Sequence, residues 1–154
     1  MHKITTFLWF DKEAGEAAKF YTSVFKGSKI KDITTLHNTP SGTVEIVTID
    51  LLGQEFQLMS AGPLFKFNES ISFVVNCQTQ KEIDWYWEKL SADPKAEQCG
   101  WCKDKFGLSW QIVPTALAEM LGDPDPEKSR RVMEAMLKMK KIEIPLLKQA
   151  YDGA

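Results

Sequence analysis

The sequence contains few of the residues that build metal and redox sites. Its 154 residues include two histidines, His2 and His37, and three cysteines. Zinc, nickel and iron are bound in proteins by imidazole, thiolate and carboxylate groups, and two of these three ligand types are scarce here. Three cysteines also do not indicate a secreted disulfide framework, and the expected location is therefore the reducing cytoplasm.

Long basic or apolar runs are also absent from the sequence. The formal net charge is −2, and the one lysine-rich stretch, Lys138–Lys141, is interrupted by Met139. We therefore expect no binding to nucleic acid, which requires a basic surface. No apolar run is long enough to span a membrane, and Met1–Thr6 lacks the apolar core of a signal peptide, so no membrane association is expected.

The most informative segment is Cys99–Pro114, because part of it is repeated earlier in the chain. Asp104–Gly107 has the composition of a turn, and the β-branched and aromatic residues of Leu108–Val113 predict a strand that Pro114 ends. Gly53–Met59 shows the same order of glycine, aromatic residue, glutamine and aliphatic residue, at a constant offset of 107 − 53 = 54 residues. Two copies are too few for a solenoid, so this repeat predicts one fold duplicated within a single domain.

The apolar periodicity predicts the order β-α-β-β-β, a linker, and then β-α-(β)-β-β. Tyr21 and Gln57 are 57 − 21 = 36 residues apart, whereas Tyr86 and Gln111 are 111 − 86 = 25 apart, so the second copy is 36 − 25 = 11 residues shorter. One strand with its turn accounts for this difference, and we expect that strand to be vestigial. The expected strands are Ile4–Phe10, Ser28–Leu36, Val44–Leu52, Glu55–Met59, Ile71–Asn76 and Leu108–Val113, and the expected helices are Ala14–Phe25, Thr79–Ser91, Ala116–Leu121, Glu127–Lys138 and Ile142–Tyr151.

These elements predict an α+β protein of one domain. Residues 1–60 form the first βαβββ module, 61–69 a linker, 70–114 a second, abbreviated module, and 115–154 a C-terminal helical extension. The extension is too apolar for a free tail, so its apolar residues must be covered by the same chain or by a partner. Because half-barrel sheets leave edges that pairing protects, we expect a twofold-symmetric homodimer. The alternative is a monomer whose tail folds back on its own domain.

The chain resembles the vicinal oxygen chelate superfamily, which has the glyoxalase and bleomycin-resistance fold. Within that superfamily it is similar to the PhnB-like family, often labelled 3-demethylubiquinone 3-methyltransferase. The resemblance implies duplicated βαβββ modules whose curled mixed sheet surrounds a pocket for a small-molecule ligand. In metal-using members, each module supplies ligands from its first and last strands. The motifs that carry the resemblance are Phe7–Asp11, Ala18–Phe25, Cys99–Trp101 and Asp104–Pro114, with Ala135–Met139 and Lys141–Ile144 in the helical extension.

The metal-ligand positions that the resemblance implies are occupied here by neutral side chains. The last-strand position, usually glutamate, falls on Gln57 and Gln111. The first-strand position, usually histidine, falls on Ser70 and on Thr5 or Thr6. Amides and hydroxyls are poor ligands for zinc, nickel or iron, so we expect the pocket but neither a metal nor another cofactor.

Residues at and near these positions are the candidates for ligand contact. Gln57 and Gln111 either contact a ligand or hydrogen-bond each other across the pseudo-twofold axis. Glu55 shares a strand face with Gln57, so it either reaches the mouth of the pocket or lies solvated at the strand end. Trp101 either stacks on a ligand or packs in the core, whereas Trp110 is expected to face the helix as a core residue.

Cys99 and Cys102 form a C-x-x-C pair without the surroundings of a redox or zinc site. A thioredoxin-like pair lies at a helix N-terminus, whereas a turn and a strand follow here. A zinc site would need a second such pair or paired histidines. We therefore interpret both cysteines as packing residues.

The glycines of the chain are scattered, and no G-x-G pattern occurs. Methyl transfer from S-adenosylmethionine usually relies on a βαβ nucleotide site with a glycine-rich turn. The methyltransferase label of the PhnB-like family is therefore not expected to describe the activity of this chain.

The sequence predicts a metal-free protein that binds a small molecule in the pocket between its two modules, with an unknown substrate and no assigned catalytic residue. Two alternatives stay open. One is a metal-dependent enzyme of the glyoxalase or dioxygenase type, and the other is a sequestering protein of the bleomycin-resistance type, which needs no catalytic residue. Metal content and an assay for turnover distinguish the three.

Overall fold

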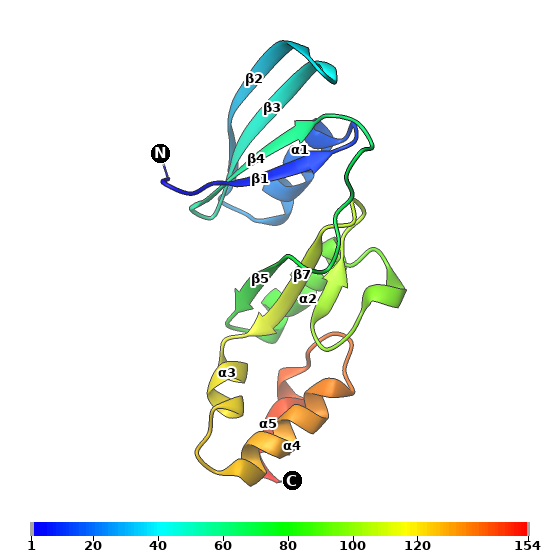
Figure 1. Ribbon diagram of the computed structural model, residues 1–154. Helices are drawn as coiled ribbons and strands as arrows, with labels where there is room; N and C mark the ends of the chain where they lie inside the picture. Colours follow the sequence, from blue (N-terminus) through cyan, green and yellow to red (C-terminus); the bar gives the residue numbers. More distant parts are fainter. Residues whose placement is uncertain (1, 154) are drawn as a thin grey trace. The chain divides into compact units, whose positions relative to one another are not determined.

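The chain divides into two compact units, Met1–Phe67 and Asn68–Ala154. The computed structural model describes residues 2–153. Each unit contains one sheet with its own helices (Figure 1). The division falls inside the predicted linker 61–69, and the C-terminal helices belong to the second unit.

The first unit is a complete βαβββ module. Its sheet order is β1-β4-β3-β2, with β1 parallel to β4 and the other pairs antiparallel. Leu52 and Gly53, which connect β3 and β4, both have positive φ, 53° and 93°, and this is the geometry of a tight hairpin turn. The elements are β1 Thr6–Phe10, α1 Ala14–Val24, β2 Lys29–Thr39, β3 Gly42–Leu51 and β4 Gln54–Ser60.

The core of the first unit lies where the alternate apolar residues of the strands meet α1 (Figure 1). In contrast, β2 is the outer strand and is exposed over almost its whole length. Two irregularities interrupt the pairing of β2 with β3, and such bulges make an edge strand a poorer template for other chains. The buried residues include Leu8, Phe10, Ala17, Tyr21, Val47, Ile49, Phe56 and Leu58.

The second unit begins with a shorter version of the same module. Its sheet order is β5-β7-β6, with β5 parallel to β7 and β6 antiparallel to it. Thr79 caps α2 by accepting a hydrogen bond from the backbone N–H of Glu82 at 3.2 Å. The elements are β5 Ser72–Cys77, α2 Gln80–Leu90, the 3₁₀ turn η1 Pro94–Ala96, β6 Trp101–Lys103 and β7 Ser109–Pro114.

The register of the two sheets confirms the predicted duplication. Both β4 and β7 pair parallel with the first strand of their unit and antiparallel with the preceding strand. Gln57 lies opposite Phe7, and Gln111 lies opposite Val74, so the two glutamines occupy equivalent positions. The second sheet has no counterpart of β2 among the described residues, and η1 lies in the shortened connection, as the 11-residue difference in spacing predicts.

The C-terminal extension folds onto the second unit. It consists of α3 Ala116–Leu121, α4 Pro126–Leu137 and α5 Ile144–Asp152, which share one buried apolar cluster. Backbone N–H groups just before β6 donate into the extension, from Cys99 to the Met139 carbonyl at 2.7 Å and from Gly100 to the Lys140 carbonyl at 2.8 Å. The buried members of the cluster are Leu117, Val132, Met139, Ile142 and Leu147.

This packing changes the argument for a partner. The most apolar part of the extension is covered by the same chain, so it does not by itself require a second subunit. Met133 and Leu137 of α4 and Leu146 of α5 remain exposed at 47%, 52% and 44%. The homodimer stays a prediction.

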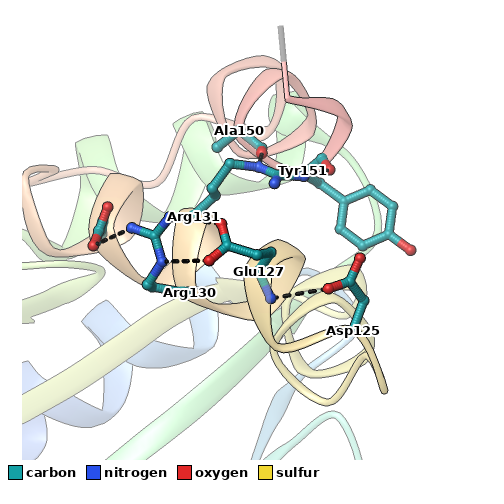
Figure 2. Close-up of polar contacts among 7 residues, drawn as sticks. Asp125, Glu127, Arg130, Arg131, Ala150 and Tyr151 are labelled. Carbon is teal, nitrogen blue, oxygen red and sulfur yellow. Dashed lines mark hydrogen bonds and ion pairs between the residues drawn. The ribbon is translucent and has the colours of Figure 1, made fainter.

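Charged side chains cap the start of α4 and form ion pairs along it (Figure 2). The carboxylate of Asp125 caps the helix by accepting the backbone N–H of Glu127 at 3.0 Å. Arg130 pairs with Glu127 at 2.7 Å and with Glu134 at 2.8 Å, one turn to either side. These exposed pairs add little stability individually, whereas the cap satisfies a backbone donor that the helix leaves free.

Arg131 joins α4 to the end of α5 (Figure 2). Its guanidinium donates to the carbonyl oxygens of Ala150 at 2.8 Å and Tyr151 at 2.9 Å. The last carbonyls of a helix have no partner within that helix, so Arg131 completes the α5 terminus. None of the helices in residues 2–153 combines the length and apolar character needed to cross a membrane.

Candidate functional site

Each sheet has one face that packs on its helix and a second face that carries polar side chains. Register partners in neighbouring strands share a face. We define the polar face of the first unit by Phe7, Thr48, Glu55 and Gln57, and that of the second unit by Ser72, Val74, Trp101, Lys103, Ser109 and Gln111.

Gln57 lies at the middle of the first polar face and is half-buried. Its amide nitrogen Nε2 lies 3.5 Å from Thr48 Oγ1, at the outer limit of a hydrogen bond. Within residues 2–153, no donor to its amide oxygen is found. A half-buried amide with this free capacity is suited to contact a polar ligand.

Glu55 is the buried charged residue of the first polar face and is only 8% exposed. Thr5 Oγ1 donates to its carboxylate at 2.8 Å, and Lys31 Nζ forms an ion pair with it at 3.0 Å. The hydrogen bond from Lys31, followed by that from Thr5, holds the pKa of Glu55 below its ordinary value. Glu55 is therefore a fixed, ionised acceptor and is not solvated at the strand end.

Gln111 has a firmer anchor on the second polar face. Its Nε2 donates to Ser72 Oγ at 2.9 Å. In both units, the amide nitrogen of the glutamine therefore lies within 3.5 Å of a hydroxyl oxygen of the same unit. Trp101 lies opposite Gln111 in the sheet and is half-buried, which leaves part of its ring able to contact another molecule.

Ser70 lies in the turn before β5, and its exposed side chain bonds to the Asn68 side chain. The hydroxyl that contacts Gln111 comes from Ser72, two residues later. Thr5 and Ser72 are counterparts, because each lies two residues before the residue opposite the glutamine. Sequence reasoning missed Ser72 because a shift of two residues keeps a side chain on the same strand face.

Ser109 forms a polar row with the outer strands of the second sheet. It lies opposite Ser72 on one side and Lys103 on the other. It is 1% exposed, and within residues 2–153 its Oγ is buried without a hydrogen-bond partner. Lys103 pairs with Glu69, which precedes β5, and this contact lowers the pKa of Glu69.

Trp110 and Asp104 belong to the core rather than to a polar face. Trp110 is 3% exposed, as predicted for a residue that faces the helix. The buried Asp104 carboxylate accepts the indole N–H of Trp110 at 2.9 Å and the backbone N–H groups of Phe106 and Leu108 at 2.9 and 3.1 Å. Asp104 therefore stabilises the turn between β6 and β7.

The C-x-x-C cysteines have unreactive surroundings. Cys102 is 2% exposed, and burial raises its pKa to about 12. Cys99 is half-buried, and burial raises its pKa as well. Because the thiolate is the nucleophile and metal ligand, both are held in the inert form, in agreement with a packing role.

The donor atoms on the two polar faces do not fit a zinc, nickel or iron ion. Among residues 2–153, no three His, Cys, Asp or Glu side chains lie close enough to hold a metal. The equivalent strand positions carry amides and hydroxyls, which bind these ions poorly. The nearby carboxylate of Glu55 is already paired with Lys31.

Comparison with solved structures identifies the class of fold. A PhnB protein from Bacillus cereus is 36% identical over 74% of this chain and 100% of that chain, with a TM-score of 0.62. The fosfomycin resistance protein FosX from Listeria monocytogenes, in complex with Mn(II) and sulfate, is 13% identical over 79% and 98%, with a TM-score of 0.53. A protein from Pseudomonas aeruginosa is 14% identical over 74% and 98%, with a TM-score of 0.57. The chain therefore has the glyoxalase/bleomycin-resistance fold of the vicinal oxygen chelate superfamily.

The particular family follows from a family model that matches residues 2–113. The chain belongs to the family described as 3-demethylubiquinone-9 3-methyltransferase, the PhnB-like family that the sequence motifs predict. The match includes β1 to β6 and nearly all of β7, and α3, α4 and α5 lie beyond it. No curated protein matches the chain.

Proposed function

We propose that this protein binds a small molecule without the help of a metal, through Gln57 and Gln111 on its two polar faces. The observation that carries the proposal is their equivalent register, with each amide directed to a hydroxyl of its own unit. Duplicated amides offer donors and acceptors but no charge, so they suit a neutral polar group of the ligand.

The neighbouring side chains extend this proposal. Trp101 offers a partly accessible indole face next to Gln111, which favours a ligand with a planar or apolar part. Glu55 offers an ionised acceptor next to Gln57. Ser70 remains a predicted contact, whereas Ser72 has the better-supported position because it touches Gln111. That both modules line one pocket stays a prediction.

Methyl transfer is a poor description of this site, despite the family's name. The β1–α1 connection is Asp11–Glu13, and the β5–α2 connection is Gln78–Thr79. Neither contains glycine, so neither provides the close backbone approach that nucleotide cofactors need at such a turn.

Two experiments test the proposal. Native mass spectrometry of freshly purified protein is expected to show a copurifying small molecule, and elemental analysis is expected to show no stoichiometric zinc, nickel or iron. Gln57→Leu and Gln111→Leu each remove an amide and are expected to weaken retention of that molecule about two- to tenfold. Gln149→Leu, at an exposed position on α5, is the matched control and should retain it fully.

Other outcomes favour the alternatives. About one tightly held metal per chain would replace the proposal by a metal-dependent enzyme of the glyoxalase or dioxygenase type. Retention without turnover of the identified molecule would favour sequestration of the bleomycin-resistance type. If the three variants retain the copurifying molecule equally, the two glutamines do not contact it.

We also propose that the chain forms a homodimer, supported by the exposed apolar residues Met133, Leu137 and Leu146. Met133 and Leu137 lie one turn apart on α4, and neighbouring exposed apolar residues mark interaction surfaces. Light scattering at micromolar concentration tests this, because a mass near 17.5 kDa is that of one chain and would exclude the dimer. The cytoplasmic location stays a prediction.

A further inference from the structure

The second polar face contains a buried polar group that the proposed function does not use. Ser109 is 1% exposed, yet its Oγ has no hydrogen-bond partner within residues 2–153. A buried hydroxyl without a partner is destabilising, so each such case calls for an explanation. A ligand oxygen or a ligand donor that reaches Ser109 would remove this penalty.

One of the two residues beside Ser109 is positively charged, and the other has a hydroxyl group. Ser72 and Lys103 flank it in the same row of the sheet, one on each neighbouring strand. The row therefore presents two hydroxyls and one ammonium group. Hydroxyl and ammonium donors together are suited to bind an anionic oxygen group.

In the structure, the anion that meets this row is a side chain of the same chain. Lys103 Nζ pairs with the carboxylate of Glu69, which comes from the segment before β5. Lys103 is on β6 and Glu69 precedes β5, and these two strands flank β7. The pair therefore lies near Ser109, the first residue of β7. Glu69 is 65% exposed at its side chain, so it is able to leave Lys103 for water at little cost.

We propose that Ser72, Ser109 and Lys103 form a subsite for an anionic oxygen group, carboxylate or phosphate, of the bound small molecule, and that Glu69 occupies this subsite in its absence. The incoming anion takes the ammonium of Lys103 and accepts a hydrogen bond from Ser109, while Glu69 turns to solvent. No bond is made or broken covalently. This inference rests on the proposed function, since it assigns a chemical class to the ligand of the same face.

The test uses the full chain, labelled with ¹⁵N, and titrates inorganic phosphate or sodium acetate at constant ionic strength. Saturable shifts of the backbone amides of Lys103 and Ser109 are expected. Saturation by phosphate alone indicates a tetrahedral anion, and saturation by acetate alone indicates a carboxylate. The absence of saturable shifts with either anion would overturn the proposal.

Three variants separate the subsite from a structural role. Lys103→Met should weaken anion binding at least about tenfold, because it removes a charge-assisted contact. Glu69→Gln should tighten it about two- to fivefold, because it removes the internal competitor. Ser109→Ala should weaken it about two- to tenfold without lowering the melting temperature, a combination that a merely structural serine would not produce.

The control is Lys105→Met, which removes the same charge from an exposed position two residues away. It should bind as the unmodified chain does. If Lys103→Met binds like this control, or if Glu69→Gln does not bind more tightly, the subsite is wrong. If the anion experiments fail while Gln57→Leu and Gln111→Leu still lose the copurifying molecule, only this inference falls and the proposed function stands.

Discussion

The two sheets have the same strand register but differ in the charged side chains at equivalent positions. Glu55 and Ser109 are counterparts, each two residues before the equivalent glutamine. In the first unit a buried carboxylate pairs with Lys31 of β2. In the second unit a buried hydroxyl lies beside Lys103, whose carboxylate partner Glu69 comes from outside the sheet.

The missing strand explains this difference. Lys31 belongs to β2, and the second sheet has no such strand among the described residues. A carboxylate at position 109 would thus lack a counterpart of Lys31, and the lysine beside it, Lys103, is already paired with Glu69. Two carboxylates would then compete for one ammonium group, and a buried charge without a full partner is destabilising. The two sheets therefore share the backbone pairing, while the side chains of the polar face differ with the shorter module.

The turns before β4 and β7 also differ, in length and in the burial of their aspartate. Asp50, near the end of β3, accepts a hydrogen bond from the turn residue Gly53, and Asp104 directly follows β6. The span between equivalent strand positions is one residue longer in the second unit. Thr48 and Trp101, the β3 and β6 partners of the two glutamines, are 101 − 48 = 53 residues apart, whereas the glutamines are 111 − 57 = 54 apart. The longer turn needs more support, and its aspartate is the buried one.

The largest expected effect comes from removing the C-terminal helices α4 and α5, which have no counterpart in the first unit. A chain ended after Gly122 lacks α4 and α5, which exposes the apolar cluster and leaves the N–H groups of Cys99 and Gly100 without their carbonyl partners. We expect loss of solubility or of the second unit's fold, measured as soluble yield and near-UV circular dichroism. Lys148→Ser, a change at an exposed position of α5 outside the proposed dimer surface, is the control. A soluble, folded, dimeric product would show that the extension is dispensable for both fold and assembly.

A smaller effect is expected from the turn aspartates. Asp104→Ala removes the acceptor of three hydrogen bonds in a buried position and should cost about 3 kcal/mol of unfolding free energy. Asp50→Ala removes one acceptor, of the Gly53 N–H at 2.7 Å, and should cost about 1 kcal/mol. Urea denaturation measures both, and equal losses would contradict the difference between the turns.

The smallest expected effect is a change in folding stability at low pH. Because Lys31 and Thr5 lower the pKa of Glu55 in the folded state, this group stabilises the fold fully above the ordinary glutamate pKa of about 4.3. That stabilisation is lost as the pH falls through the folded-state pKa. Glu55→Gln should therefore be less stable than the unmodified chain at pH 7, and the gap should narrow at pH 3. A gap of constant size would mean that the Lys31 pair does not contribute.

Local sequence was sufficient for most of the elements and for the duplication, although β6 and η1 received no predicted range. The glycine, aromatic residue and glutamine at a fixed offset identified β4 and β7 as equivalent, since strand alternation fixes which residues share a face. Turn and capping chemistry is equally local, which is why Gly53 and Gly107 mark turns and Asp125 caps a helix. These features depend on neighbours a few residues apart, and the sequence states those directly.

The tertiary structure decided which distant side chains meet. Ser72 rather than Ser70 touches Gln111, because the pairing of β5 with β7 sets the register, and no local signal distinguishes two positions on one strand face. The pairing of Glu55 with Lys31 depends likewise on where β2 packs. The burial of Ser109 without a partner became visible only once three strands and the Glu69 segment were assembled, since burial is a property of the packed chain and not of a residue type.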